Sequence, residues 1–167
     1  YCLANNNNPG ISDICKEMEI ININDAQLIK EYSIKQSINI AIIGPESPLA
    51  YGVADSLWEA GIGVVGPKKN LAQIETSKSF TRNLLREYKI PGCPKFKTFT
   101  NMEGVEDFLS LLGENYVVKY DGLAGGKGVK VAGDHLHSHE EALSYCKELI
   151  ESGGHFVIER KLIGEEF

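Results

Sequence analysis

The sequence predicts an α/β fold, with a parallel sheet in its first part and a mixed α+β arrangement in its second. Up to about residue 66, short apolar strand patterns alternate with helical patterns, which is the rhythm of a mostly parallel sheet. From about residue 73 onward helices and strands still mix, but this rhythm is lost. We therefore predict two domains, residues 1–72 and 73–167, with the boundary between Leu71 and Ile74.

The composition is that of an ordinary globular protein. The chain has 167 residues, of which 43% are hydrophobic, and a formal net charge of −6. With an acidic balance and no basic face, we expect no nucleic-acid partner. No apolar run reaches the length of a transmembrane helix, so we expect no membrane partner. The four cysteines form no Cys-x-x-Cys pair, which favours reduced thiols and a cytoplasmic location.

The first part of the chain reads as four strands separated by turns and two helices. Strands are predicted over residues 1–4, 19–23, 38–43 and 62–66, and helices over about 25–32 and 49–60. Asn24 is the expected N-cap of the first helix, and Gly61 is expected to end the second. Because the run 38–43 is almost continuously apolar, we expect a strand that is covered on both faces.

The turn after the third strand contains Gly44, Pro45 and Glu46. In open parallel sheets, ligands sit beyond the carboxyl ends of the strands. Because this turn lies at such an end, Glu46 is a candidate for contacting a substrate. A tight turn with a solvated Glu46 explains the same residues equally well.

The second part reads as three helices and several strands. Helices are predicted over about 78–88, 102–112 and 139–151, with Ser77 before the first and Asn101 as the N-cap of the second. Strands are predicted over 95–99, 116–120, 129–132 and 155–159. Ser138 and Glu141 have the spacing of a capping box at the start of the last helix.

A glycine-rich hairpin over residues 116–132 is the strongest functional signal. Two runs rich in Val and Tyr flank a loop that contains Gly122, Gly125, Gly126 and Gly128. Glycines let backbone N–H groups approach an anion, and Lys119 and Lys127 add positive charge. Lys127 is followed by Gly128, which excludes a Walker A loop, and the return into a strand excludes a Rossmann loop. The hairpin therefore indicates a lid over nucleotide phosphates, with a flexible hairpin that has glycines at bulges as the alternative.

His135, His137 and His139 suggest a metal site, because alternate residues share one face of a strand. The capping residues Ser138 and Glu141 instead place this stretch at the junction of a loop and a helix. We therefore favour solvated loop histidines over metal ligands, and we assign no metal-binding residue.

Five separated segments carry a family resemblance, and they are residues 43–49, 66–67, 72–80, 117–129 and 158–166. In order and spacing they resemble the glycinamide ribonucleotide synthetases (phosphoribosylamine–glycine ligases), purine-biosynthesis enzymes of the ATP-grasp superfamily. The glycine hairpin together with Gly-Pro-Glu is specific to this family, whereas the closing Glu-x-x-Leu-x-Gly-x-Glu is shared across ATP-grasp ligases. The resemblance runs from about Asn8 to the end of the chain.

The resemblance implies a fold and a set of binding residues. Residues 1–72 would form an incomplete Rossmann-like, substrate-binding domain, and residues 73–167 the first α+β part of an ATP-grasp domain with its phosphate lid. The residues implied to bind ATP are Lys78, Lys119, Gly122, Gly125, Gly126, Lys127, Gly128, Glu159, Arg160, Leu162 and Glu166. Lys78 and Lys119 would contact phosphates, residues 159–162 the adenine edge, and Glu166 the ribose hydroxyls. Gly44, Pro45 and Glu46 would contact a substrate.

The implied activity is the ATP-dependent ligation of glycine to 5-phosphoribosylamine, which gives glycinamide ribonucleotide, ADP and phosphate by way of a glycyl phosphate. The implied cofactors are ATP and Mg²⁺ or Mn²⁺, with the carboxylate ligands of the metal in a C-terminal half beyond Phe167. The implied parent protein is a monomer. Tyr120 and Gly125 stand where members of the family usually have Ala. Gly125 leaves the loop backbone free to adopt many conformations, and we expect Tyr120 in place of Ala to have no effect on function.

We expect the chain to be a fragment of a longer protein, because it opens with Tyr1 inside an apparent strand and stops shortly after another. We also expect the fragment alone not to turn over, because phosphoryl transfer normally needs the missing metal site. The alternatives are another ATP-grasp carboxylate–amine ligase, a nucleotide-binding module without catalysis, and an inactive truncation that misfolds.

Overall fold

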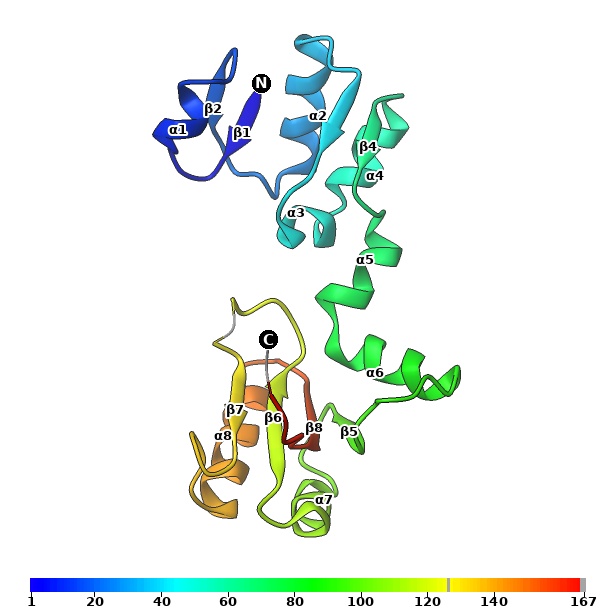
Figure 1. Ribbon diagram of the computed structural model, residues 1–167, viewed down its shortest axis with the longest axis vertical. Coiled ribbons are helices and arrows are strands. Elements are labelled where there is room, and N and C mark those ends of the chain that lie inside the picture. The colour runs from blue at the N-terminus through cyan, green and yellow to red at the C-terminus, as the bar shows by residue number, and fades with distance from the viewer. Residues whose placement is uncertain (126, 166–167) are drawn as a thin grey trace. The chain divides into compact units, whose positions relative to one another are not determined.

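The computed structural model describes residues 1–125 and 127–165 (Figure 1). The chain divides into two compact units, Tyr1–Gln73 and Ile74–Phe167. The first unit contains β1 (Cys2–Ala4), α1 (Pro9–Ser12), β2 (Met18–Ile20), α2 (Ala26–Lys35), β3 (Ile40–Ile42), α3 (Glu46–Ala50), α4 (Val53–Glu59) and β4 (Gly63–Val65), and it ends within α5 (Lys69–Thr76).

The strands of the first unit pair in parallel, as predicted. β1 pairs with β2, and β3 pairs with β4, each over three residues. Helices α2 and α4 supply a core of Ile29, Val53 and Leu57, on which Ala41 and Ile43 pack from the third strand and its end. Burial of these side chains, which stabilises the fold by about 25 cal/mol per Å² of apolar surface, holds the strands and helices together.

The prediction that the third strand, β3, is covered on both faces was wrong. Ala41 and Ile43 turn toward the core, whereas Ile40 and Ile42 are 69% and 78% exposed. Alternate side chains of a strand point to opposite faces, and the core of this unit takes up only one of them. An unbroken apolar run does not by itself show whether one face is buried or both.

Two details of the predicted helices in this unit were also wrong, and two short helices were missed. Asp25, not Asn24, caps α2 and accepts a hydrogen bond from the Leu28 N–H at 3.0 Å. The single helix expected over 49–60 is two helices, because Gly52 takes φ +80° and interrupts the hydrogen-bond ladder. Helices α1 and α5 were not predicted. Gly61, with φ +77°, follows the end of α4 as expected.

The second unit is built on one antiparallel sheet. Its elements are α6 (Lys78–Glu87), β5 (Phe96–Phe99), α7 (Val105–Leu112), β6 (Tyr116–Tyr120), β7 (Val129–Val131), α8 (His139–Glu151) and β8 (Phe156–Arg160). The strand order is β5-β8-β6-β7, and every neighbouring pair is antiparallel. The mixed α+β arrangement and the hairpin between β6 and β7 were both predicted.

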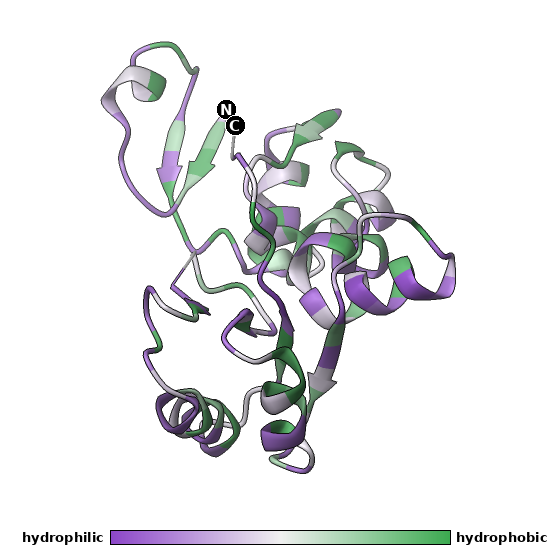
Figure 2. Ribbon diagram, turned by 60° about the horizontal axis from the view of Figure 1, so that its bottom comes forward, coloured by the Kyte–Doolittle hydropathy of each residue, from purple (hydrophilic) through white to green (hydrophobic). Residues whose placement is uncertain are grey.

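The two faces of this sheet have different neighbours. Tyr116 and Val118 on β6, with Phe156 and Ile158 on β8, belong to a buried core that α7 and α8 complete. The alternate residues, which include Lys119 and Glu159, point to the other face, where α6 contacts β8. The helices mix hydrophobic and hydrophilic residues around their circumference (Figure 2), as expected for elements that bury one side. One face of the sheet therefore packs against the hydrophobic core, and the other face carries the charged side chains.

The helix caps of the second unit follow the predictions except at one position. Ser77 and Ser138 cap α6 and α8, and each accepts a hydrogen bond from the N–H three residues on. Gly104 caps α7 in place of Asn101, whose side chain instead accepts from the nearby Glu103 N–H at 2.9 Å. Among the described helices, none combines the length and apolar character that crossing a membrane requires.

Candidate functional site

The glycine hairpin begins where β6 ends. Lys119 pairs with Val129 across the hairpin, and the Tyr120 N–H donates to the Gly128 carbonyl at 2.7 Å. In the loop, Gly125 takes φ +53°, and the Lys127 N–H donates to the Ala124 carbonyl at 3.0 Å to close a turn. Lys127 is exposed. The prediction for Gly126 lies outside the described residues.

The Tyr120 side chain packs against three glycines, at positions 122, 128 and 154. A Cβ atom at Gly122 would lie 2.7 Å from Tyr120 Cε1, and one at Gly154 would lie 2.8 Å from Cε2. A Cβ atom at Gly128 would lie 2.9 Å from the Cβ atoms of both Tyr120 and Ala124. Glycine at these positions makes room for the ring, which joins the base of the loop to the turn that precedes β8.

The N-terminus of α6 is fastened to the start of the same loop. Asp121 accepts hydrogen bonds from the Ser77 hydroxyl and the Ser79 N–H, both at 3.1 Å. A carboxylate at this position also interacts favourably with the positive end of the helix dipole. The Lys78 ammonium donates to the Gly122 carbonyl at 3.0 Å. These bonds hold Lys78 and the first residues of the loop together.

Beside this junction, one buried carboxylate is shared by two cations. Glu159 is 5% exposed, and its Oε2 accepts a hydrogen bond from Arg82 Nε of α6 at 2.6 Å. Its Oε1 forms an ion pair with the Lys119 ammonium from the neighbouring strand. We call Arg82, Glu159 and Lys119 the charge triad. Two positive charges and one negative charge leave it with a net charge of +1.

Burial opposes ionisation of Glu159, but hydrogen bonds from Arg82 and Lys119 outweigh it, so the pKa of this carboxyl lies below its ordinary value of 4.5. The hydrogen bond with Glu159 also raises the pKa of the Arg82 guanidinium. Glu159 and Arg82 are therefore charged at neutral pH. Lys119 lies near the end of β6, beside the glycine hairpin, so the excess positive charge of the triad lies where an anion would be attracted.

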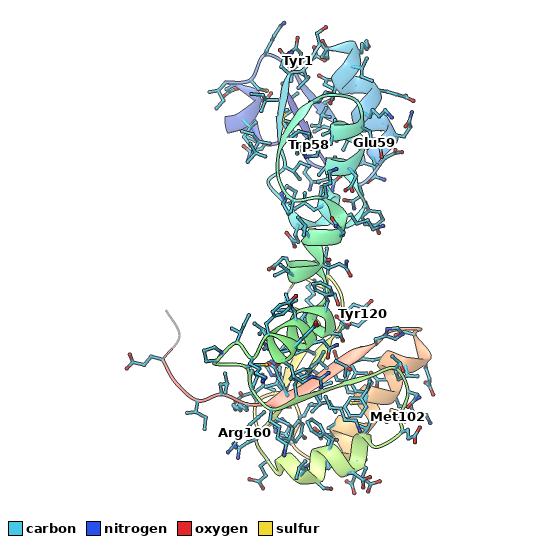
Figure 3. The ribbon with its side chains drawn as sticks, turned by 90° about the vertical axis from the view of Figure 1, so that its right-hand side faces the viewer. Tyr1, Trp58, Glu59, Met102, Tyr120 and Arg160 are labelled. Atoms are coloured by element: carbon cyan, nitrogen blue, oxygen red, sulfur yellow. The ribbon has the colours of Figure 1, made fainter. Side chains whose placement is uncertain are left out.

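The predicted strand-end linker lies at the opposite end of the sheet. Tyr120 pairs with Phe156 and Tyr116 with Arg160, so the loop and the linker are separated by four strand steps, about 13 Å. Figure 3 shows Tyr120 and Arg160 accordingly far apart. The Arg160 N–H donates to the Lys95 carbonyl at 2.8 Å, and Leu162 is 68% exposed. The prediction for Glu166 lies outside the described residues.

Gly44, Pro45 and Glu46 belong to the first unit. Pro45 is the N-cap of α3, and Glu46 is exposed in the first turn of that helix. The adjacent Ser47 hydroxyl, within α3, donates to the Asn24 side chain at 2.8 Å, so the helix that follows the β3 loop is bonded to the loop after β2. These loops follow the carboxyl ends of parallel strands, where ligands usually bind in such sheets.

Two of the histidines bond to the backbone. His135 Nδ1 accepts from the Val131 N–H at 3.3 Å, and His139 Nε2 lies 2.9 Å from the Gly113 carbonyl oxygen. His137 lies just before α8, and its N–H donates to Glu141. Within residues 1–125 and 127–165, no group of three His, Cys, Asp or Glu side chains is arranged to hold a metal ion.

The structure therefore brings together part of the predicted set. Lys78 contacts Gly122 at the start of the loop, and Lys119 pairs with the side chain of Glu159, whereas Arg160 and Leu162 lie at the far end of the sheet. Sequence reasoning missed Arg82 and Asp121. Arg82 follows Lys78 by four residues, which places both on one side of a helix, and this spacing was the available signal.

Two family models match consecutive parts of the chain. The model described as Phosphoribosylglycinamide synthetase, N domain, matches residues 1–75, and the model described as Phosphoribosylglycinamide synthetase, ATP-grasp (A) domain, matches residues 76–167. A phosphoribosylamine–glycine ligase from Methanosarcina barkeri is 47% identical over 167 residues, which is 100% of this chain and 38% of the relative. The chain thus spans well under half the length of that relative.

Two solved structures extend the comparison. A D-alanine–D-alanine ligase from Bacillus anthracis aligns over 98% of this chain and 57% of its own, with a TM-score of 0.70 and 23% identity, which shows a shared fold alone. A phosphoribosylamine–glycine ligase from Thermotoga maritima aligns over 81% of this chain and 33% of its own, with a TM-score of 0.64 and 26% identity.

Proposed function

The chain belongs to the phosphoribosylglycinamide synthetase family, and on this premise we propose that it forms the ATP-binding part of a ligase that joins glycine to 5-phosphoribosylamine. The observation that supports the proposal most is the convergence of Lys78, Lys119 and the glycine hairpin on one face of the second unit's sheet. Because the chain covers 38% of its ligase relative, the activity is proposed for the complete protein.

The geometry supports one orientation of ATP on this face. The phosphates would lie at the hairpin end, where Lys119, Lys78 and loop N–H groups supply positive charge and donors. The adenine would lie at the other end, where the backbone leaves the sheet after Arg160 and Leu162 is exposed. The separation of about 13 Å between these ends suits an extended nucleotide.

The remaining roles are proposed from the family. Gly44, Pro45 and Glu46 would contact glycine or phosphoribosylamine in the substrate-binding domain, residues 1–72. The described residues do not fit a magnesium or manganese site, because Asp121 and Glu159 are already engaged with Ser77 and Arg82. We assign the metal ligands to residues beyond this chain. The complete protein would act in the cytoplasm as a monomer.

The proposed reaction has two steps. A glycine carboxylate oxygen attacks the γ-phosphorus of ATP, the bond to the β-phosphate oxygen breaks, and ADP leaves. The phosphoribosylamine nitrogen then attacks the carbonyl carbon of glycyl phosphate, loses a proton and expels phosphate. Lys78 and Lys119 would hold the phosphates in line and stabilise the charge that develops on them, so no protein nucleophile is needed.

The test is ADP formation by the full-length protein with ATP, glycine and phosphoribosylamine together, and with each of the two acceptors omitted in turn. We expect ADP only in the complete mixture. ADP formation that continues with another carboxylate or amine but not with this pair would instead identify a different carboxylate–amine ligase.

A further inference from the structure

The charge triad contains one residue to which neither the sequence pattern nor the proposed reaction gives a role. Arg82 reaches from the middle of α6 to the carboxylate of Glu159, which is also the partner of Lys119. The Arg82 and Lys119 side chains are 22% and 24% exposed, whereas that of Glu159 is 6% exposed. The two cations thus reach the buried anion from positions at the edge of the solvent.

A lysine in a one-to-one pair with a buried carboxylate is electrically neutral and attracts a phosphate weakly. In the triad, Arg82 engages Oε2 of Glu159 at 2.6 Å and leaves Oε1 to Lys119. A guanidinium is always charged and is less strongly hydrated than an ammonium, so it suits a lasting contact with a buried carboxylate. Lys119 can then turn to an incoming anion without leaving Glu159 as an unpaired buried charge.

We propose that Arg82 is a positioning residue that neutralises Glu159 and thereby keeps Lys119 available to the phosphates of the nucleotide. This inference rests on the proposed binding of ATP at the glycine hairpin. The competing explanation is that Arg82 only fastens α6 to the sheet. In that case its loss would lower stability but would not interact specifically with the charge of Glu159.

The experiment compares nucleotide affinities of the full-length protein and five variants. Arg82→Met is expected to weaken ATP binding about tenfold, because a moderate electrostatic loss has this size. Binding of adenosine, which has no phosphate, is expected to stay within about twofold. Arg82→Lys should recover most of the affinity for ATP. Arg86→Met is the matched control, since Arg86 lies one turn further along α6 and bonds to Asn83.

The decisive variant is Arg82→Met combined with Glu159→Gln. If Arg82 acts by neutralising Glu159, the double variant should bind ATP within about threefold of Glu159→Gln alone, because the charge to be neutralised is gone. A further tenfold loss in the double variant would overturn the proposal. This comparison still decides the question if Arg82→Met alone does not fold.

The experiment distinguishes failure of the proposed nucleotide site from failure of the proposed role of Arg82. A full-length protein that folds but binds no ATP contradicts the nucleotide site itself. A protein that binds ATP equally well with and without Arg82 contradicts only the role of that residue.

Discussion

Replacing Lys119 with Met is expected to weaken ATP binding by about 10- to 100-fold. A charge-assisted hydrogen bond contributes about 1.5 to 3 kcal/mol, and Lys119 lies on β6 just before the glycine hairpin. The loss should be far smaller for adenosine, because the proposed contact is with phosphates. Calorimetric titration of the full-length protein with both ligands measures the difference.

Lys130→Met provides the control for this variant. Lys130 lies on β7 of the same hairpin, but its ammonium sits 3.8 Å from the ring centre of Tyr145 on α8, away from the charge triad. The Lys130→Met variant should bind ATP with the affinity of the wild-type protein. Equal losses of ATP and adenosine affinity in Lys119→Met would show that the variant disturbs the site in general and that Lys119 does not contact phosphates.

Glu159→Gln is expected to lower the free energy of unfolding by about 2 to 3 kcal/mol at about pH 7, because two partly buried cations lose their shared anion. The lowered pKa of Glu159 sets the pH dependence. A carboxyl whose pKa falls on folding stabilises the protein above its unfolded value of 4.5, and this contribution is lost as the pH falls through the folded value. The difference between wild type and variant should therefore shrink below pH 4.5.

Denaturant unfolding at neutral and at acid pH measures this difference. Glu151→Gln is the matched control, because Glu151 forms an exposed ion pair with Lys147 on α8, and exposed pairs contribute little. It should change the unfolding free energy by less than about 0.5 kcal/mol. A Glu159→Gln difference that stays constant down to acid pH would contradict the assignment of Glu159 as an ionised, paired carboxylate.

Features that depend on neighbouring residues were predictable from the sequence. The Ser77 cap, the glycine hairpin and the parallel pairing of the first unit follow from caps, turns and apolar periodicity within short windows. Errors arose where two local signals compete. Asn24 and Asp25 are both good caps, and only the structure shows that Asp25 accepts the helix N–H while Asn24 bonds to Ser47.

The contacts that organise the candidate site could not be predicted in the same way. Arg82 and Glu159 are 77 residues apart in the sequence, and Ser77 and Asp121 are 44 apart. Such pairs depend on the strand order β5-β8-β6-β7, which places the middle of α6 over β8. The family resemblance implied separate roles for Lys119 and Glu159. It did not reveal that Lys119 and Arg82 both pair with the Glu159 carboxylate.

Hydrogen–deuterium exchange of the full-length protein with and without ATP tests the central claim most directly. The claim is that the nucleotide lies along the α6-facing side of the second unit's sheet, with its phosphates under the glycine hairpin. We predict that ATP slows exchange in residues 121–128 and in the segment after Arg160, and leaves α7 on the opposite face unchanged. If ATP binds and neither segment gains protection, the site is wrongly placed.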